Sequence, residues 1–394
     1  MNTVNTTKPS LIDVARSLSE QIFPRSLEIE SRKNLPPDIV NDLTTAGFFR
    51  MMVPEQFGGL ECDPQTFVEV IEQLAKGDGS VAWCTYIHCA SCIVSAYLAP
   101  DVASELFSPG TVKVSGAYAP TGRAIRTVEN GVSGFRVTGK WGWGSGAVNA
   151  DLLIAGCVII GEGGKPELLP NGKPRLQSII LKREQVRLLH NWTAFGLKGT
   201  GSGEFEVLNE FVPEQYSTCL FTDRQSDTPL YRFPLFGLLG LGIAAVALGL
   251  AHAAINELKK ISDEIKAGIK KQTASHLQVH QITVARAEAR LLSSRAFFLD
   301  AIETAWRQAQ HPQPATLENR CAVRLATTFA VDSSVEVVQS MFALGGGTAI
   351  FESSRLQQYL RDILVLSKHL MITSATYEQL GCISLGVEVA IDTL

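Results

Sequence analysis

The spacing of apolar residues changes twice along the chain. From Leu11 to about Phe107, apolar positions recur every three or four residues, as on a helix with one buried face, and prolines and glycines mark the breaks. From about Val112 to Phe211 the period falls to two, in short runs rich in β-branched and aromatic residues. From about Pro234 to the end, helical spacing returns in long segments. The pattern therefore predicts helices, then a small antiparallel sheet or barrel, then a helical bundle.

Composition narrows the class of protein and the kind of partner. The 394 residues are 45% hydrophobic and 19% charged, which is typical of a globular chain with two or three packed units. A net charge of −4 without any Lys/Arg block argues against nucleic acid or an anionic membrane as a partner. The polar N-terminus has no apolar signal core, and the eight cysteines are irregularly spaced, as buried thiols of a reducing compartment are. We therefore expect a cytoplasmic protein.

Two segments invite other interpretations. Leu235–Ile255 is long and apolar enough to span a bilayer, but it contains His252 and runs directly into an amphipathic, charged stretch. Its many Gly and Ala residues favour a buried helix of a soluble bundle. Cys89–Cys92 reads C-x-x-C beside His88, yet no second pair follows at zinc-finger spacing. We expect these thiols to pack as small apolar groups, and we predict no metal site.

Four motifs follow one another in the order used by the acyl-CoA dehydrogenase superfamily of flavoproteins, which the chain therefore resembles. They are "FFRMMVPEQFGGL" (Phe48–Leu60), "GKWGWGSGAVNAD" (Gly139–Asp151), "FGLKGTGSGEFEVLNEFVP" (Phe195–Pro213) and "SSRLQQYLRDI" (Ser353–Ile363). Their agreement in order is far more specific than any single motif. The resemblance implies an α+β fold: an N-terminal α-helical domain (residues 1–111), a central antiparallel β-barrel (residues 112–228) and a C-terminal four-helix bundle (residues 229–394). It also implies a homotetramer.

The superfamily contains two chemistries, and the position of the catalytic base separates them. Its dehydrogenases remove an α-proton with a glutamate that stands either shortly after the "RD" pair or at the start of the bundle. Here the first place holds Lys368, His369 and Leu370, and the second, "FPLFGLLGLGIAAVALG", contains no acidic residue. A thioester α-proton is too weakly acidic to leave without a positioned base. The sequence therefore disfavours desaturation.

Three residues match the other branch, the two-component flavin monooxygenases. His369 stands at the place of that branch's C-terminal histidine, His88 matches the histidine after its "GDgSxaW" segment, and Ser145 matches its serine near the flavin. The resemblance implies that these three residues are catalytic. Imidazoles can hydrogen-bond a C4a-hydroperoxyflavin and later move a proton, whereas a carboxylate would repel the peroxide anion. A hydroxyl can bond flavin N5 or the peroxide without adding charge.

The implied reaction is hydroxylation of a small aromatic or heteroaromatic substrate through the C4a-hydroperoxyflavin. O2 is the co-substrate, and a separate flavin reductase supplies reduced FAD or FMN. The cofactor-binding residues that the resemblance implies are Trp143, Ser145, Gly199, Thr200, Gly201, Ser202, Gly345 and Gly346. An arginine and an "FG" pair of many dehydrogenases are missing from "IKAGIKKQTASHLQ", where Lys270 or Lys271 is a possible substitute. This departure leaves FAD versus FMN open.

The candidate residues also have simpler interpretations. His88 fits a satisfied core histidine, and His369 fits a structural bridge to Asp362. Ser145 and the "GTGSG" turn (Gly199–Gly203) fit ordinary turn residues.

Other roles and functions also stay open. Trp141, Trp143 and Phe342 either line an aromatic pocket or fill the core. The protein itself could be an acyl-CoA dehydrogenase-like dehydrogenase or oxidase with a displaced base. It could also be a non-catalytic paralogue that binds flavin or a protein partner.

Overall fold

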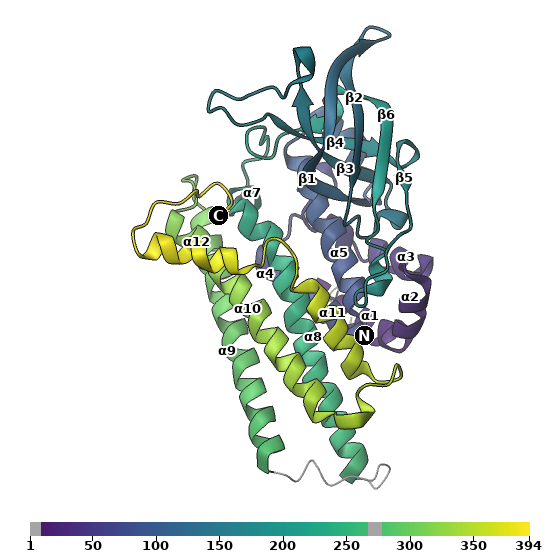
Figure 1. The fold of residues 1–394 in the computed structure, drawn as a ribbon, viewed down its shortest axis with the longest axis vertical. Coiled ribbons are helices and arrows are strands. Elements are labelled where there is room, and N and C mark those ends of the chain that lie inside the picture. The colour runs from purple at the N-terminus through teal and green to yellow at the C-terminus, as the bar shows by residue number, and fades with distance from the viewer. Residues whose placement is uncertain (1–8, 267–277) are drawn as a thin grey trace, which may run out of the picture.

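Six α-helices form the N-terminal region of the computed structural model, which describes residues 9–266 and 278–394 (Figure 1). They are α1 (Leu11–Ile22), α2 (Ser26–Arg32), α3 (Pro37–Thr45), α4 (Pro64–Gly77), α5 (Gly79–Ser91) and α6 (Pro100–Phe107). The side chains of Ser10, Asp63 and Asp78 accept hydrogen bonds from first-turn amides of α1, α4 and α5. These caps satisfy amides that have no partner within the helix, and so they fix where each helix begins.

One mixed sheet of seven strands follows the helices. The strands are β1 (Val114–Glu129), β2 (Val132–Trp141), β3 (Leu152–Ile160), β4 (Leu176–Lys182), β5 (Arg187–Leu188), β6 (Phe205–Pro213) and β7 (Ser217–Thr218). Their order in the sheet is β5-β6-β2-β1-β3-β4-β7. β1 and β3 are parallel, while the other neighbouring pairs are antiparallel.

The expected closed antiparallel barrel is therefore wrong in two respects. The sheet is open, because its edge strands β5 and β7 are two residues long and pair only with β6 and β4. It is mixed, because the chain crosses from the end of β2 to the start of β3 and re-enters beside β1 in the same direction. A period of two identifies strands, but it carries no information about strand direction or closure.

Helices return after the sheet. They are α7 (Pro229–Arg232), α8 (Leu235–Lys266), α9 (Gln278–Ala309), α10 (Leu317–Leu344), α11 (Arg355–Leu366) and α12 (Ser374–Ser384). The long helices α8, α9 and α10 run alongside one another, and α11 packs against α8 and α10 (Figure 1).

The apolar segment at the start of this region is a core helix. Within the described ranges, α8 is the one helix long and apolar enough to cross a bilayer, and 89% of its most apolar window is buried inside the protein. Its glycines allow close packing: a Cβ on Gly242 would lie 2.1 Å from the ring of Tyr86, and one on Gly249 would lie 2.5 Å from the carbonyl oxygen of Glu72. The prediction of a buried helix is confirmed, and the small residues let α8 approach α4 and α5.

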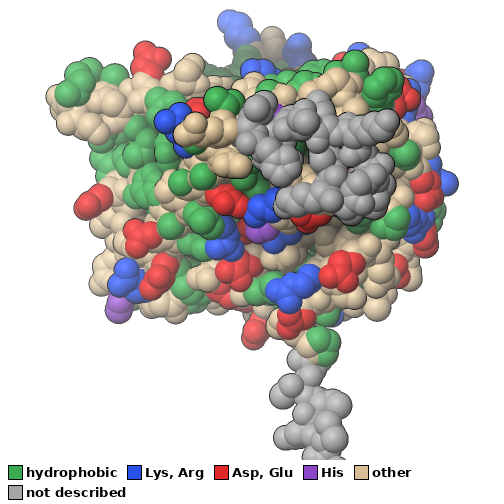
Figure 2. Space-filling view, turned by 90° about the horizontal axis from the view of Figure 1, so that it is seen from below, with side chains coloured by type: hydrophobic (Ala, Val, Ile, Leu, Met, Phe, Trp, Pro, Cys, Tyr) green, Lys and Arg blue, Asp and Glu red, His purple; other side chains and the backbone are tan. Residues whose placement is uncertain are grey.

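The three regions share apolar cores across their junctions. One core joins the N-terminal helices to α8–α11, a second fills the sheet, and a third lies between the sheet and the helices near α6. The helix α5 contacts β1, α8 and α11, so it lies where all three regions meet (Figure 1). The domain boundaries near residues 111 and 228 stay predictions. On the end of the molecule seen in Figure 2, acidic and basic side chains are interspersed.

Candidate active site

Trp83 links the predicted catalytic residues. It lies on α5, and its indole Nε1 donates a hydrogen bond of 3.0 Å to Ser145 Oγ, in the loop after β2. Its ring lies 5.8 Å from the ring of His369, measured between centroids, in an edge-on arrangement. His88 lies on the same helix and faces Gly146, the residue after Ser145. The structure therefore brings His88, Ser145 and His369 to one place, from three segments far apart in the sequence.

His88 has one satisfied and one unsatisfied ring nitrogen. Nδ1 lies 2.9 Å from the carbonyl oxygen of Val114, which only accepts, so Nδ1 carries the proton and Nε2 presents a lone pair. Nε2 is buried and has no partner in the described chain, and a Cβ on Gly146 would lie 2.7 Å from it. Burial lowers the pKa of His88 to about 4, so the ring is neutral at ordinary pH. A buried acceptor without a donor is costly, and it marks a position that a ligand can satisfy.

Ser145 belongs to a chain of buried hydroxyls. Ser145 Oγ and Ser202 Oγ are 2.6 Å apart, and Ser202 Oγ is 2.6 Å from Thr200 Oγ1. Thr200 donates to the carbonyl oxygen of Leu197 at 2.8 Å, so it must accept from Ser202, which in turn accepts from Ser145. Ser145 Oγ thus donates to Ser202 and accepts from Trp83. One of its lone pairs remains free.

The glycine-rich turn is shaped by its contacts with the helices. The short 3₁₀ helix η8 (Lys198–Thr200) ends at Gly201, whose φ of +55° is in the left-handed region. A Cβ on Gly199 would lie 2.3 Å from Ile29 Cγ2, and one on Gly201 would lie 2.8 Å from the carbonyl oxygen of Lys33. These glycines are therefore required by packing against α2 and the residue that caps it. The turn also holds the Ser145 loop, because Gly146 N donates to Thr200 O at 2.9 Å.

His369 lies just beyond the end of α11 and is half-buried. Its Nδ1 accepts a hydrogen bond of 3.3 Å from the backbone of Met371, so Nε2 carries the proton of the neutral ring. Burial and the nearby cation of Arg324 lower the pKa of His369 to about 4. The ring is therefore an uncharged donor.

The alternative bridge between His369 and Asp362 is wrong. Asp362 is buried and accepts a 2.6 Å hydrogen bond from the backbone of Leu197, and in the described residues it forms no bond with His369. Burial, and then the neighbouring Asp78, raise the pKa of Asp362 to about 8. Asp362 is an anchor for the turn at Leu197 and not a partner of the imidazole.

Trp143 lies at the edge of this cluster. Its side chain is 71% exposed and meets Trp192 edge-on at 5.8 Å. Its φ of +67° is in a region that non-glycine residues rarely adopt. An exposed indole held in this conformation is free to contact a ligand.

The other aromatic and glycine candidates lie elsewhere. Trp141 is buried in the sheet, stacked on Phe205 at 5.2 Å with its Nε1 bonded to Gly156 O, so it fills the core. Phe342 is partly buried against the helical core. Gly345 and Gly346 lie at the far end of α10 (Figure 1), and within one chain the structure does not bring them to Ser145. Lys270 and Lys271 lie outside the described residues.

Two functionally placed residues were missed from the sequence. Trp83 ends the segment "GSVAW", five residues before His88, and a buried indole N–H needs an acceptor, which is a signal that could have found it. Arg324, on α10, had no such signal, because its burial near His369 depends on tertiary packing. The thiols of the C-x-x-C segment are buried, and burial raises the pKa of Cys92 to about 12, so that thiol stays protonated.

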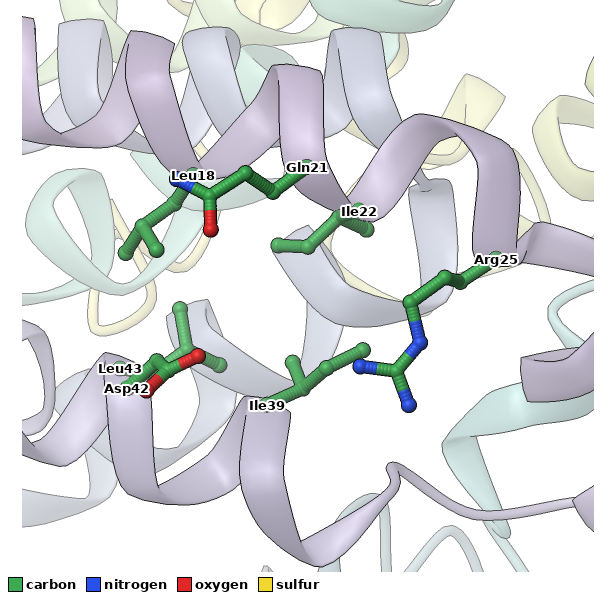
Figure 3. Close-up of a pocket in the computed structure, with 7 residues that line it drawn as sticks. All are labelled: Leu18, Gln21, Ile22, Arg25, Ile39, Asp42 and Leu43. Carbon is green, nitrogen blue, oxygen red and sulfur yellow. The ribbon is translucent and has the colours of Figure 1, made fainter.

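Two surface cavities lie away from this cluster. One of about 40 Å³ lies between α1 and α3 and is lined by Leu18, Gln21, Ile22, Arg25, Ile39, Asp42 and Leu43 (Figure 3). The other, of about 190 Å³, lies between the sheet and α6 and is lined by residues that include Leu106, Ile180 and Tyr216. Neither contains a predicted catalytic residue, and the first is far smaller than a site for an aromatic ligand.

Comparison with known families gives matches at both ends of the chain. The family model described as "Acyl-CoA dehydrogenase, N-terminal domain" matches residues 10–100. The model described as "Acyl-CoA dehydrogenase, C-terminal domain" matches residues 241–374. These ranges hold α1–α5 and most of α8–α11, the helices that carry Trp83, His88 and His369 or the turn beyond them.

Known relatives cover nearly the full length. An indole-3-acetate monooxygenase of Pseudomonas putida is 30% identical over 361 residues, which is 91% of this chain and 89% of that protein. The oxygenase subunit HsaA of a flavin-dependent monooxygenase of Rhodococcus jostii is 25% identical over 359 residues, 86% of this chain and 88% of its own. The structure of XiaF from Streptomyces in complex with FADH2 and glycerol superposes with a TM-score of 0.87 at 21% identity, covering 98% of this chain and 97% of that one.

Proposed function

Because this chain belongs to the acyl-CoA dehydrogenase superfamily, in its branch of flavin-dependent monooxygenases, we propose that it hydroxylates a small aromatic or heteroaromatic substrate with O2. A separate reductase supplies the reduced flavin, as the designation "oxygenase subunit" of the Rhodococcus relative indicates for that protein. One observation carries the proposal: Ser145 and His369 lie against Trp83, His88 faces Gly146 beside Ser145, and in the described chain none of their side-chain hydrogen bonds reaches a carboxylate. A dehydrogenase would need a base here.

The residues present fit a reduced flavin. The free lone pair of Ser145 Oγ and the unpartnered lone pair of His88 Nε2 are both acceptors, and they flank Gly146. A reduced isoalloxazine carries N–H groups, which are donors, so this donor–acceptor set suits the reduced form. The exposed Trp143 offers an aromatic face beside the same loop.

When bound, reduced flavin supplies the two electrons that activate O2 toward an electron-rich substrate. The overall reaction balances: it converts a substrate C–H group, O2 and reduced flavin with its two protons into a substrate C–OH group, water and oxidised flavin. His369 serves this reaction as a neutral Nε2–H donor toward a developing negative charge on oxygen, and it can also relay a proton. His88 and Ser145 accept hydrogen bonds and hold the ligand in place. The burial of His88 and Ser145 limits the access of water, which would divert the activated oxygen to hydrogen peroxide.

The decisive experiment supplies reduced flavin and ¹⁸O2 to the enzyme with a panel of phenols and indoles. Mass spectrometry should find one ¹⁸O atom in the product, and oxygen consumed should match product formed. In His369→Ala, oxygen consumption should continue while product falls at least about tenfold and hydrogen peroxide rises in its place. Turnover of an acyl-CoA under nitrogen would identify a dehydrogenase instead. No oxygen consumption with any substrate would identify a non-catalytic paralogue.

We further propose that α8–α11 form a four-helix bundle through which the chain assembles as a homotetramer in the cytoplasm. Apolar side chains that are at least one-third exposed lie on α9 and α10, namely Leu292, Phe297, Leu325 and Phe329, and Phe297 meets Phe329 at 6.3 Å. In Figure 2 apolar side chains gather at the left, the side on which Figure 1 shows α9 and α12. Such an assembly gives Gly345 and Gly346 a role at a neighbouring subunit's flavin. The free state of all eight cysteines suits a reducing compartment.

A further inference from the structure

Arg324 is a buried cation that has no counter-ion among the residues the structure describes. Its side chain is 6% exposed, and in the described chain neither Nε nor Nη1 has a hydrogen-bond partner. The remaining terminal nitrogen, Nη2, makes one long contact of 3.4 Å with Thr376 Oγ1 on α12. The guanidinium stays charged in proteins, and a buried charge is normally paired because its desolvation is costly. Arg324 therefore presents an unfilled site for an anion.

One of the two unpaired nitrogens, Nη1, lies close to the candidate active site. A Cβ placed on Gly240, near the start of α8, would lie 3.5 Å from Arg324 Nη1 and 3.7 Å from Met371 Cε. Met371 is two residues beyond His369 and donates its backbone N–H to that imidazole. Gly240 places no side chain against Nη1, which is buried and has no hydrogen-bond partner among the described residues. The cation therefore lies beside the turn that carries His369.

Aromatic groups lie next to this cation. Trp83 meets Tyr86 edge-on at 5.5 Å and His369 at 5.8 Å, so three rings form one wall. Tyr86 is fixed by a hydrogen bond of 2.6 Å from its hydroxyl to Leu239 O, the residue before Gly240. An aromatic surface with a cation at one side matches a ligand that has an aromatic ring and a short acidic side chain.

We propose that Arg324 binds the carboxylate of the substrate, so that the enzyme takes small aromatic carboxylates of the arylacetate class. This inference rests on the proposed hydroxylation and names its substrate class. Nη1 carries two N–H groups and has no partner among the described residues, so it can donate to a carboxylate oxygen, and the positive charge of the guanidinium attracts the anion. The relative from Pseudomonas putida is named for such a compound, indole-3-acetate.

Two probes that match in shape but differ in charge test the inference on the full-length enzyme. Isothermal titration compares indole-3-acetate with its neutral amide, indole-3-acetamide, on wild-type protein. The acid should bind at least about tenfold more tightly, since hydrogen bonds to charged groups contribute about 1.5–3 kcal/mol and each 1.4 kcal/mol corresponds to a factor of ten. This comparison needs no variant, so a variant that misfolds cannot hide the answer.

Variants then assign the preference to one side chain. Arg324→Met, which keeps most of the volume and removes the charge, should weaken the acid about tenfold or more while leaving the amide within about twofold. Arg324→Lys should keep part of the preference. Arg290→Met, which removes an exposed arginine that pairs with Glu336 on the surface, is the matched control and should change neither probe.

Three results would overturn the inference: equal binding of acid and amide to wild-type enzyme, equal loss of both probes in Arg324→Met, or a loss of flavin binding with substrate binding unchanged. The last would place a flavin phosphate at Arg324. The outcome is separable from the proposed function. Preferential binding of the acid without ¹⁸O transfer would refute the hydroxylation and keep the site, whereas ¹⁸O transfer without a preference for the acid would refute the site alone.

Discussion

Gly146 offers a sharp test of the contact between the Ser145 loop and His88. Its φ of +71° lies in the left-handed region, and a Cβ there would come within 2.7 Å of His88 Nε2. Gly131, in the β1–β2 turn, has a φ of +79°, but a Cβ at that position would meet no other atom within 4 Å among the described residues. Gly131→Ala is therefore a matched control, because it introduces the backbone strain without the contact.

The two glycine variants should differ by a predictable amount. Both carry the left-handed strain, which costs about 1–2 kcal/mol for a residue with a Cβ. In Gly146→Ala the imidazole must also move, and it is held by the 2.9 Å bond from Nδ1 to Val114 O. Breaking that bond, or leaving Val114 O buried without a donor, costs about a further 1–3 kcal/mol of stability. Gly146→Ala should therefore be the more destabilised variant by that margin.

Thermal unfolding of both variants measures the difference. At about 2 °C or less per kcal/mol for a chain of this size, Gly146→Ala should melt a few degrees below Gly131→Ala. Adding His88→Ala removes the clashing ring, so the double variant His88→Ala/Gly146→Ala should show less than the sum of the two single losses. Equal Tm values for the two glycine variants, or strict additivity in the double variant, would refute the argued contact between His88 and Gly146.

Other parts of the molecule give three further predictions. The pKa of Asp362 is raised from 3.8 to about 8, so its contribution to the free energy of unfolding is complete below pH 4 and is lost as the pH rises toward 8. The Tm of wild type should therefore fall between pH 5 and pH 8, while that of Asp362→Asn stays nearly flat. The pKa of His369 is lowered to about 4, so its ring stays neutral from pH 6 to 8, and the product formed per reduced flavin should be constant over that range in wild type. His369→Gln retains an N–H donor and should keep part of this product yield. A marked change of the yield near pH 7 in wild type would count against a neutral donor. Phe329→Glu should dissociate the proposed tetramer, because it places a charge in the apolar surface on α9 and α10. Light scattering would then give a lower molecular mass, whereas an unchanged mass would exclude that surface as an interface.

The sequence located the elements better than it located their arrangement. The switch from a spacing of three and four to a spacing of two marked the sheet, since burial on one face imposes these periods directly. The parallel pairing of β1 with β3 was not foreseen, because strand direction depends on where the chain crosses after β2. For Trp141 the sequence left a pocket and the core as alternatives. The core is correct, because Trp141 on β2 pairs with Phe205 on β6, and only the register of the two strands reveals this distant partner.

The candidate site divides in the same way. His88, Ser145 and His369 could be predicted because each stands in a motif of contiguous residues; in the structure Ser145 and His369 lie against Trp83, and His88 faces Gly146. Arg324 stands in no such motif. It was identified because two of its buried nitrogens have no hydrogen-bond partner among the described residues. An unsatisfied buried group is a property of the folded surroundings, so a sequence alone cannot show it.

The hydrogen bonds also give a reason for an acidic residue that takes no part in proton removal. Leu197 has a φ of +47°, an unfavourable conformation for a leucine, and it is held on both sides: its N–H donates to Asp362, and its carbonyl accepts from Thr200. Thr200 continues the chain of hydroxyls through Ser202 to Ser145. Asp362 on α11 is therefore connected through hydrogen bonds and the backbone of Leu197 to the hydroxyl of Ser145. The carbonyl of Leu197, which can only accept, sets the direction in which Thr200, Ser202 and Ser145 donate, and the aspartate of the "RD" pair holds Leu197 in place.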